Sequence, residues 1–388
     1  MKNNLKFLLL LLISLSISCS QSIKTTKETQ TVIDKYIIGY IFPQNKILNP
    51  EEIAVEKLTH INYAFADISD GKIIEGFKYD GENLKILNEL KSINPELKIL
   101  ISVGGWTWSG NFSDMALTKA NRQKFIESSI EFIQKHRLDG IDLDWEYPGL
   151  PGMGNTHRKK DKKNFTRLLK QFRKSLDDLG NTGQKHYLLT IAAGAFEDYL
   201  NHTEMKKAQK YLDFVNIMTY DFTGAWNPKT GHHSNLYASS FDPEGNSCNK
   251  AVSMFMQRGV PAEKIVLGVP FYGRGWQNVN PQQNGLYNDS QGWEEGFSYN
   301  NLVEKFINKN GFVRLWDESA RSPYLWNDND RKFITYDDPE SLNEKCNYIK
   351  MNGLRGVMFW VYHADNKNEL LNTIYENLAV EKKSSPID

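Results

Sequence analysis

Three acidic residues at alternate positions, Asp142, Asp144 and Glu146, stand in the segment 140–147 (GIDLDWEY). Alternate residues of a β-strand share a face, so these carboxyl groups would line one side while the apolar residues between them face the other. Carboxylates gathered in a protein interior are costly unless they share protons or find partners, and such clusters concentrate at catalytic sites. A metal site or an acidic edge strand is the alternative, but the run contains no histidine and its apolar face is unusually regular for an edge. The pattern therefore favours catalysis.

The order of the three carboxyl groups predicts how they divide the chemistry. Glu146 lies outermost, and burial beside other acids should raise its pKa and keep it protonated as a general acid for a leaving oxygen. Asp144 lies next to it and Asp142 lies deeper, so the closely spaced groups should titrate as a coupled set. Asp139, which precedes the segment, is expected to stabilise the turn.

These residues need a scaffold, and the chain around them alternates short apolar, β-branched runs with longer amphipathic stretches. Near-continuous hydrophobic strands separated by helices indicate a parallel sheet covered by helices. Eight such strands match an α/β fold of the (β/α)8 TIM barrel type, whose active sites lie at the C-terminal ends of the strands. The expected strands are 36–42, 60–68, 98–105, 140–146, 188–194, 214–221, 265–273 and 356–362, with clear helical patterns at 122–136, 162–179 and 251–258. A doubly wound open sheet is the rival, weakened because no G-x-G-x-x-G turn follows the first strand.

One connection is too long for a simple loop. Roughly sixty residues separate the seventh strand from the helix near Pro339, and a structureless loop of that length is anomalous in a compact domain. Short strands at 312–317 and 332–336 predict a small α+β insertion domain over 274–336, between the seventh strand and the last helix. The catalytic barrel is expected to span 34–380, followed by a frayed tail at 381–388.

The acidic segment resembles the D-x-x-D-x-D-x-E signature of glycoside hydrolase family 18, the chitinase family. Companion motifs occur in order: SVGG at 102–105 in the third strand, MTYD at 218–221 in the sixth, and Trp360 in the eighth. The resemblance extends over about 37–372. It implies a chitinase that hydrolyses β-1,4 bonds between N-acetylglucosamine units by a retaining, substrate-assisted mechanism, with no cofactor and no metal.

The resemblance implies catalytic roles for five residues. Glu146 would protonate the leaving oxygen while the substrate's own 2-acetamido carbonyl attacks the anomeric carbon. Asp144 would hold the acetamido N–H, and Asp142 would store the shared proton. Tyr220 would hydrogen-bond the acetamido oxygen, and Asp221 would support the distorted sugar and the oxazolinium ion. The substrate must then carry an N-acetyl group beside the cleaved bond.

Aromatic residues are implied on the binding side. Trp360 would floor the pocket at the cleaved sugar, while Trp106, which follows Gly105 at the end of the third strand, and Tyr147 would flank the leaving side. Other implied contacts line the pocket or hold sugars further along: Tyr40, Phe65, Met218, Tyr272, Arg274 and Trp226. For the first three of these, plain core packing is an equal alternative.

The N-terminus has the pattern of an export signal. Lys2 and Lys6 precede a short apolar run and then small residues up to Ser18, which is the order found in a signal peptide, here 1–18. The run is too short to span a bilayer comfortably. Cys19 closes a loose lipobox, so we expect its lipidation, a polar tether over 19–33, and an exported lipoprotein anchored on the periplasmic or cell-surface side. Ordinary cleavage nearby, giving a secreted protein, is the alternative.

Composition argues against a nucleic-acid partner. The 388 residues include 47 Lys and Arg against 47 Asp and Glu, without a basic stripe, so the electrostatic contribution that drives nucleic-acid binding is missing. Chitin or chitooligosaccharides are the expected partners of a monomeric chain. Cys248 and Cys346 should lie at different heights of two parallel helices, beyond disulfide reach, so two buried thiols are expected. The loop histidines are interpreted as solvated residues without a role: His157, His232 and His233.

Two alternative functions remain at this point. An endo-β-N-acetylglucosaminidase acting on N-linked glycans shares the chemistry but typically lacks the insertion. A non-catalytic chitin-binding lectin on the same barrel usually loses the final acid, which Glu146 supplies here.

Overall fold

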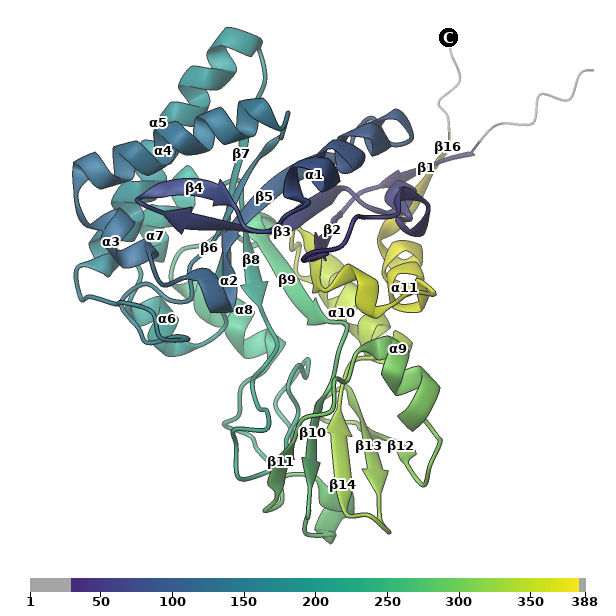
Figure 1. Ribbon diagram of the computed structural model, residues 1–388. Coiled ribbons are helices and arrows are strands. Elements are labelled where there is room, and N and C mark those ends of the chain that lie inside the picture. Colours follow the sequence, from purple (N-terminus) through teal and green to yellow (C-terminus); the bar gives the residue numbers. More distant parts are fainter. Residues whose placement is uncertain (1–28, 384–388) are drawn as a thin grey trace, which may run out of the picture. The chain divides into compact units, whose positions relative to one another are not determined.

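A closed ring of parallel strands forms the centre of the structure (Figure 1), a computed structural model that describes residues 29–383. Each strand pairs in parallel with both neighbours, and the pairing of β2 with β3 closes the ring. The eight strands are β2 (Tyr36–Ile41), β3 (His60–Ser69), β5 (Lys98–Gly104), β6 (Gly140–Asp144), β7 (Leu188–Gly194), β8 (Phe214–Met218), β9 (Ile265–Pro270) and β15 (Gly356–Trp360). The predicted (β/α)8 barrel is confirmed.

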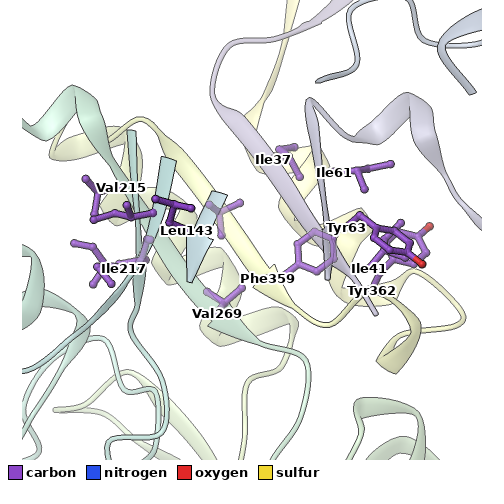
Figure 2. Packing of buried hydrophobic residues seen from close by; sticks show 14 of the residues in the cluster. Ile37, Ile41, Ile61, Tyr63, Leu143, Val215, Ile217, Val269, Phe359 and Tyr362 are labelled. Carbon is purple, nitrogen blue, oxygen red and sulfur yellow. The ribbon is translucent and has the colours of Figure 1, made fainter. Parts of the chain in front are cut away.

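The outward face of these strands packs against helices in one large apolar core. Figure 2 shows members of this core from several strands, among them Leu143 of β6, Val215 of β8 and Val269 of β9. The main covering helices are α1 (Asp80–Glu89), α4 (Lys119–Lys135), α5 (Asp161–Gly183), α8 (Cys248–Gln257), α10 (Pro339–Met351) and α11 (Glu369–Leu378). In α5 the buried residues include Phe165, Leu169 and Phe172, a spacing of four and three that places them on one face.

The strands end earlier at the C-terminal side than the sequence predicts. β6 ends at Asp144 rather than at Glu146, and β8 ends at Met218 rather than at Asp221. Residues such as Trp145 remain buried beyond the last ladder bond, so the apolar pattern reports burial rather than strand pairing. Four short helices lie in the connections between barrel strands: α2 (Gly105–Trp108), α3 (Phe112–Leu117), α6 (Glu197–Asn201) and α7 (Met205–Ala208).

One further strand, β4 (Lys72–Glu75), forms an antiparallel hairpin with β3 that the sequence analysis did not predict. Asp70 and Gly71 make the two-residue turn, with φ of 49° and 69°. An Asp-Gly pair with both φ values positive is the preferred turn of a tight hairpin, so the signal was present in the sequence.

Between β9 and α10 lies a five-stranded antiparallel sheet, called the β10–β14 sheet below. Its order is β11-β10-β14-β13-β12, and Figure 1 shows it next to the arrowhead ends of β8 and β9. Its strands are β10 (Arg274–Gln277), β11 (Gln291–Trp293), β12 (Val313–Asp317), β13 (Ser322–Asn327) and β14 (Lys332–Thr335), with α9 (Tyr299–Asn301) between β11 and β12. The predicted strands at 312–317 and 332–336 match β12 and β14. β13 was missed because it is buried throughout and shows no alternation.

Near the chain ends, β1 (Thr29–Ile33) and β16 (Ala379–Lys383) form a separate two-stranded sheet. The last residues of the predicted tether and the first of the predicted tail therefore have strand structure, which their composition did not predict. Cys19 and the predicted signal peptide lie outside the described residues. Within 29–383, no helix combines the length and the apolar character needed to cross a bilayer.

The two cysteines of the barrel are buried free thiols, as predicted. Cys248 is the first residue of α8, whereas Cys346 lies more than halfway along α10. Burial raises the pKa of both thiols, so they are packing residues rather than nucleophiles.

Candidate active site

The innermost carboxyl group, that of Asp142, is fully buried inside the barrel and accepts four hydrogen bonds. Its Oδ2 accepts from the hydroxyls of Tyr40 and Ser102, both at 2.8 Å. Its Oδ1 accepts from the Thr190 hydroxyl at 2.6 Å and from the Asn216 amide at 3.2 Å. Burial raises the pKa of Asp142 although these four donors favour the charged form. Donors from four different strands thus hold a carboxyl group that would otherwise be costly to bury.

Asp144 and Glu146 continue this row of carboxyl groups towards the C-terminal end of the barrel. Burial, together with the neighbouring charges of Glu146 and Asp142, raises the pKa of Asp144 well above its usual value. Its Oδ1 has no hydrogen-bond partner among the described residues, which leaves an acceptor available. Burial also raises the pKa of Glu146 to about 7, with a further upward contribution from Asp221 and a downward one from Tyr147. Glu146, the outermost group, is therefore protonated in a large fraction of molecules near neutral pH.

Trp360, at the end of β15, covers the inner side of the barrel mouth. Its ring stacks on Phe65 at 5.5 Å between centroids and lies 5.9 Å from Tyr40 and 5.6 Å from Phe42. All four belong to an apolar cluster inside the barrel. Tyr40 and Phe65 pack in the interior and line the site at the same time, because this cluster forms the floor of the site beside Asp142.

Tyr220 lies after β8, and its hydroxyl is not committed to a strong partner. Its nearest hydrogen-bonding contact among the described residues is the Met358 sulfur at 4.0 Å, and its ring packs edge-on against Tyr272 at 6.2 Å. Met218, two residues earlier, is half-buried against the same inner cluster. The Tyr220 hydroxyl is therefore available for a further hydrogen bond.

Asp221 is held by a charge from the β10–β14 sheet. Arg274 donates to both carboxylate oxygens, at 2.8 and 2.9 Å, and its guanidinium lies 5.0 Å from the ring centre of Tyr272 and 5.2 Å from that of Trp226. His233 Nδ1 lies 3.5 Å from Asp221. Burial would raise the pKa of Asp221, but His233 and Arg274 hold it well below its usual range. Trp226, the Arg274 guanidinium and Asp221 thus form one stacked, charged wall.

Two of the three loop histidines are buried, so the prediction that they are solvated is wrong. His233 is 0% exposed and His232 is 2% exposed, while His157 is exposed as predicted. His232 Nε2 lies 3.2 Å from Asp317 of β12, and the His233 backbone N–H donates to Thr335 of β14. The loop is buried because the β10–β14 sheet covers it. Burial also lowers the pKa of His233, which keeps its ring neutral.

Just after β5 and β6, Trp106 and Tyr147 form a partly exposed aromatic pair. Trp106 is 50% exposed, and its ring centre lies 6.4 Å from that of Tyr147. The preceding Gly105 has φ of 73°, and a Cβ there would lie 2.6 Å from the Phe65 ring. A side chain at this position is therefore excluded by backbone conformation and by space, and the glycine lets α2 approach the floor of the site.

Every predicted catalytic and binding residue lies in a barrel strand, in the loop or short helix that follows one, or at the first residue of β10. Thr190 and Asn216 were not predicted as site residues, although a polar residue inside each of two apolar strand runs was a usable signal. Ser109 and Asn155, for which the sequence carries no signal, were not predicted either. In the described part of the chain, no group of three or more His, Cys, Asp or Glu side chains is arranged to hold a metal ion.

Comparison with known proteins supplies the family. The family model for glycosyl hydrolases family 18 matches residues 36–365. Chitinase A1 of Niallia circulans is 38% identical, over 100% of this chain and 64% of that protein's length; Chitinase 1 of Aphanocladium album is 34% identical, over 85% and 81%. The structure of a family 18 N-acetylglucosaminidase from Paenibacillus barengoltzii superposes with a TM-score of 0.82 at 44% identity, covering 89% of this chain and 100% of that one.

The family match spans most of the barrel and contains the acidic strand, the aromatic floor and the Asp221 wall described above. The chain therefore belongs to the glycosyl hydrolases of family 18.

Proposed function

We propose that the chain is a chitinase that hydrolyses β-1,4 bonds between N-acetylglucosamine units, with Glu146 as its general acid and base. The row of carboxyl groups along β6 carries this proposal, because burial raises the pKa of Glu146 to about 7. An acid whose pKa lies near the working pH can both donate and take back a proton efficiently. The similarity to two proteins named as chitinases supports the same substrate class.

The proposed cleavage uses the substrate's own N-acetyl group as the nucleophile. Glu146 gives its proton to the glycosidic oxygen as the bond from that oxygen to the anomeric carbon breaks, and the 2-acetamido carbonyl oxygen bonds to the same carbon. Water then adds to the anomeric carbon of the oxazolinium ion, reopens it, and returns a proton to Glu146. Two inversions at one carbon give overall retention of configuration.

The surrounding residues suit the other demands of this reaction. Asp144, with an available oxygen, would accept the acetamido N–H and favour the attacking rotamer, while Asp142 would store the proton they share. The free hydroxyl of Tyr220 would donate to the acetamido oxygen. The charge of Asp221, fixed by Arg274, would stabilise the positive oxazolinium ion. The sugar at the cleaved bond would rest on Trp360.

The test is mass spectrometry of a soluble N-acetylglucosamine hexamer incubated with the native protein and with Glu146→Gln. The native protein should release shorter oligomers, and the variant should be slower by at least about a hundredfold, the lower limit expected for loss of a general acid. Glu197→Gln, an exposed carboxylate at the start of α6, is the matched control and should cleave normally. Cleavage by Glu146→Gln at the native rate would contradict the acid assignment. Single N-acetylglucosamine units as the sole early product would match the activity named for the Paenibacillus barengoltzii relative.

The surroundings of the site and the cellular location are part of the same proposal. The β10–β14 sheet would act as the α+β insertion domain that deepens a chitin-binding groove, and the monomer would be anchored by a lipid on Cys19. A Cys19→Ala protein that remains in the membrane fraction would refute the anchor. Elution of the purified 34–380 region as a dimer would refute the monomer.

A further inference from the structure

The chain leaves the barrel sheet just before Glu146, the residue whose carboxyl group must point at the glycosidic oxygen. The ladder of β6 with β5 ends at the pair Gly104 and Asp144, and the ladder with β7 ends at Leu143 and Ile191. The peptide groups of Glu146 therefore have no strand partner, although the residue is only 8% exposed. Buried N–H and C=O groups need partners, and here two side chains from different loops supply them.

Ser109, the residue after α2, supplies the partner for the N–H group. It is 1% exposed, and its Oγ accepts the N–H of Glu146 at 2.8 Å. The same oxygen lies 2.9 Å from the carbonyl oxygen of Gly105 and 3.1 Å from that of Asp144. Because a hydroxyl has one proton and two lone pairs, its single proton serves these two carbonyls while a lone pair receives the N–H. Ser109 thus ties α2, which carries Trp106, to the backbone of the acid.

Asn155 supplies the partner for the carbonyl group. It is 8% exposed, and its Nδ2 donates to the carbonyl oxygens of Glu146 and Leu150, each at 3.2 Å. Its Oδ1 accepts the backbone N–H of Gly152, which fixes the amide in place. A Cβ on Gly152 would lie 2.2 Å from the Glu146 carbonyl oxygen. The loop 147–155 is therefore folded tightly against this carbonyl.

We propose that Ser109 and Asn155 are positioning residues that clamp the two peptide groups flanking the α-carbon of Glu146 and so fix the direction of its carboxyl group. The inference rests on the proposed role of Glu146 as the acid. The direction of the Cα–Cβ bond follows from the backbone, so fixing the N–H on one side and the C=O on the other fixes where the side chain begins. A displacement of about 1 Å at a reacting group can cost about a hundredfold in rate.

The Ser109 contacts also connect Glu146 to α2, the helix that carries Trp106 on the expected leaving side of the site. Because one hydroxyl contacts both the first residue of α2 and the Glu146 N–H, it holds the backbone that carries Trp106 next to the backbone of the acid. A sugar stacked on Trp106 would then have its glycosidic oxygen at a fixed distance from the acid.

The test compares Ser109→Ala and Asn155→Asp with the native protein and a matched control. Asn155→Asp keeps an acceptor for Gly152 but loses the donor to Glu146. The control is Ser129→Ala, which deletes an equally buried hydroxyl that donates to Phe125 inside α4, away from the site. Three quantities are measured: kcat and KM on the hexamer, the melting temperature, and the pKa of the Glu146 carboxyl by carbon NMR without substrate.

Ser109→Ala should lower kcat about ten- to a hundredfold, and Asn155→Asp should lower it about tenfold. The double variant should lose less than the product of the two effects, because both residues fix one group. The pKa of Glu146 should fall in Ser109→Ala, since a carboxyl group released from its buried position becomes better solvated, whereas the new carboxylate of Asn155→Asp should raise this pKa by charge repulsion. Ser129→Ala should keep kcat within about twofold and the pKa unchanged, whatever its melting temperature.

The proposal is overturned if both variants keep native kcat while Ser109→Ala leaves the Glu146 pKa unshifted, or if they lose no more activity than Ser129→Ala. Should Ser109→Ala fail to fold, kcat of Asn155→Asp compared with that of Ser129→Ala decides. If the native protein does not cleave the hexamer, the proposed function fails instead. The NMR pKa then still decides the clamp, because it needs no substrate.

Discussion

A buried ion pair that contacts the segment before Tyr220 through Ser234 allows a quantitative test of how much it stabilises the fold around the site. Lys345 of α10 has a side chain 1% exposed, and its Nζ lies 2.5 Å from Asp337 and 2.8 Å from the Ser234 hydroxyl. Ser234 in turn donates to the carbonyl oxygen of Thr219, the residue before Tyr220. Lys345→Met removes the positive charge, leaves Asp337 buried without it, and removes the anchor of Ser234.

The expected size of the effect follows from burial. Removing one member of a buried ion pair costs about 3–5 kcal/mol, because the remaining charge stays out of water. The unfolding entropy near 60 °C is about 2.1 cal/mol/K per residue, or roughly 0.7 kcal/mol/K for the unit 33–380. Lys345→Met should therefore lower the melting temperature by about 4–7 °C. Lys345→Met combined with Asp337→Leu removes both charges and should recover at least about half of that loss.

Calorimetry tests this prediction by measuring the melting temperatures of the two variants and one control. Lys350→Met, on the same helix, removes an exposed ammonium whose hydrogen bond within residues 29–383 goes to the carbonyl of Asn377, and it should change the melting temperature by less than about 1 °C. The reasoning is refuted if Lys345→Met melts within a degree of Lys350→Met. It is refuted equally if the double variant is less stable than the single one.

Two further predictions concern activity on soluble N-acetylglucosamine oligomers. Asp221→Asn removes a negative charge that raises the pKa of Glu146, so this pKa should fall below about 7, and the decline of kcat/KM at high pH should begin at lower pH; an unmoved decline would show that the Asp221 charge does not act on Glu146. Trp106→Ala deletes a ring that is 50% exposed and should raise KM for the hexamer roughly three- to tenfold by loss of stacking, with less than about 1 °C change in melting temperature; an unchanged KM would remove Trp106 from the binding surface.

The barrel and the carboxyl row could be predicted because both depend on local periodicity. Alternation along β6 placed Asp142 and Asp144 on one face, and the buried Leu143 on the other. The hairpin turn at Asp70 and Gly71 was equally local, and a search for Asp-Gly pairs between apolar runs would have found it.

The remaining parts of the site depend on contacts between segments far apart in sequence. Arg274 reaches Asp221 across 53 positions, and His232 reaches Asp317 across 85. Polar loop composition predicts solvent exposure for His232, but a sheet formed much later in the chain buries it. Ser109 and Asn155 are likewise isolated polar residues whose roles appear only when two loops meet the end of β6.

The ion pair of Asp221 and Arg274 limits how this enzyme could be altered by recombination. Arg274 is the first residue of β10, so the β10–β14 sheet supplies the counter-charge of Asp221, a carboxylate that follows β8. A chimera joined just before β10 would leave that carboxylate uncompensated unless the donor sequence also began with arginine. A junction placed after Arg274 keeps the ion pair with Asp221, so the rest of the β10–β14 sheet could be exchanged between relatives without removing that counter-charge.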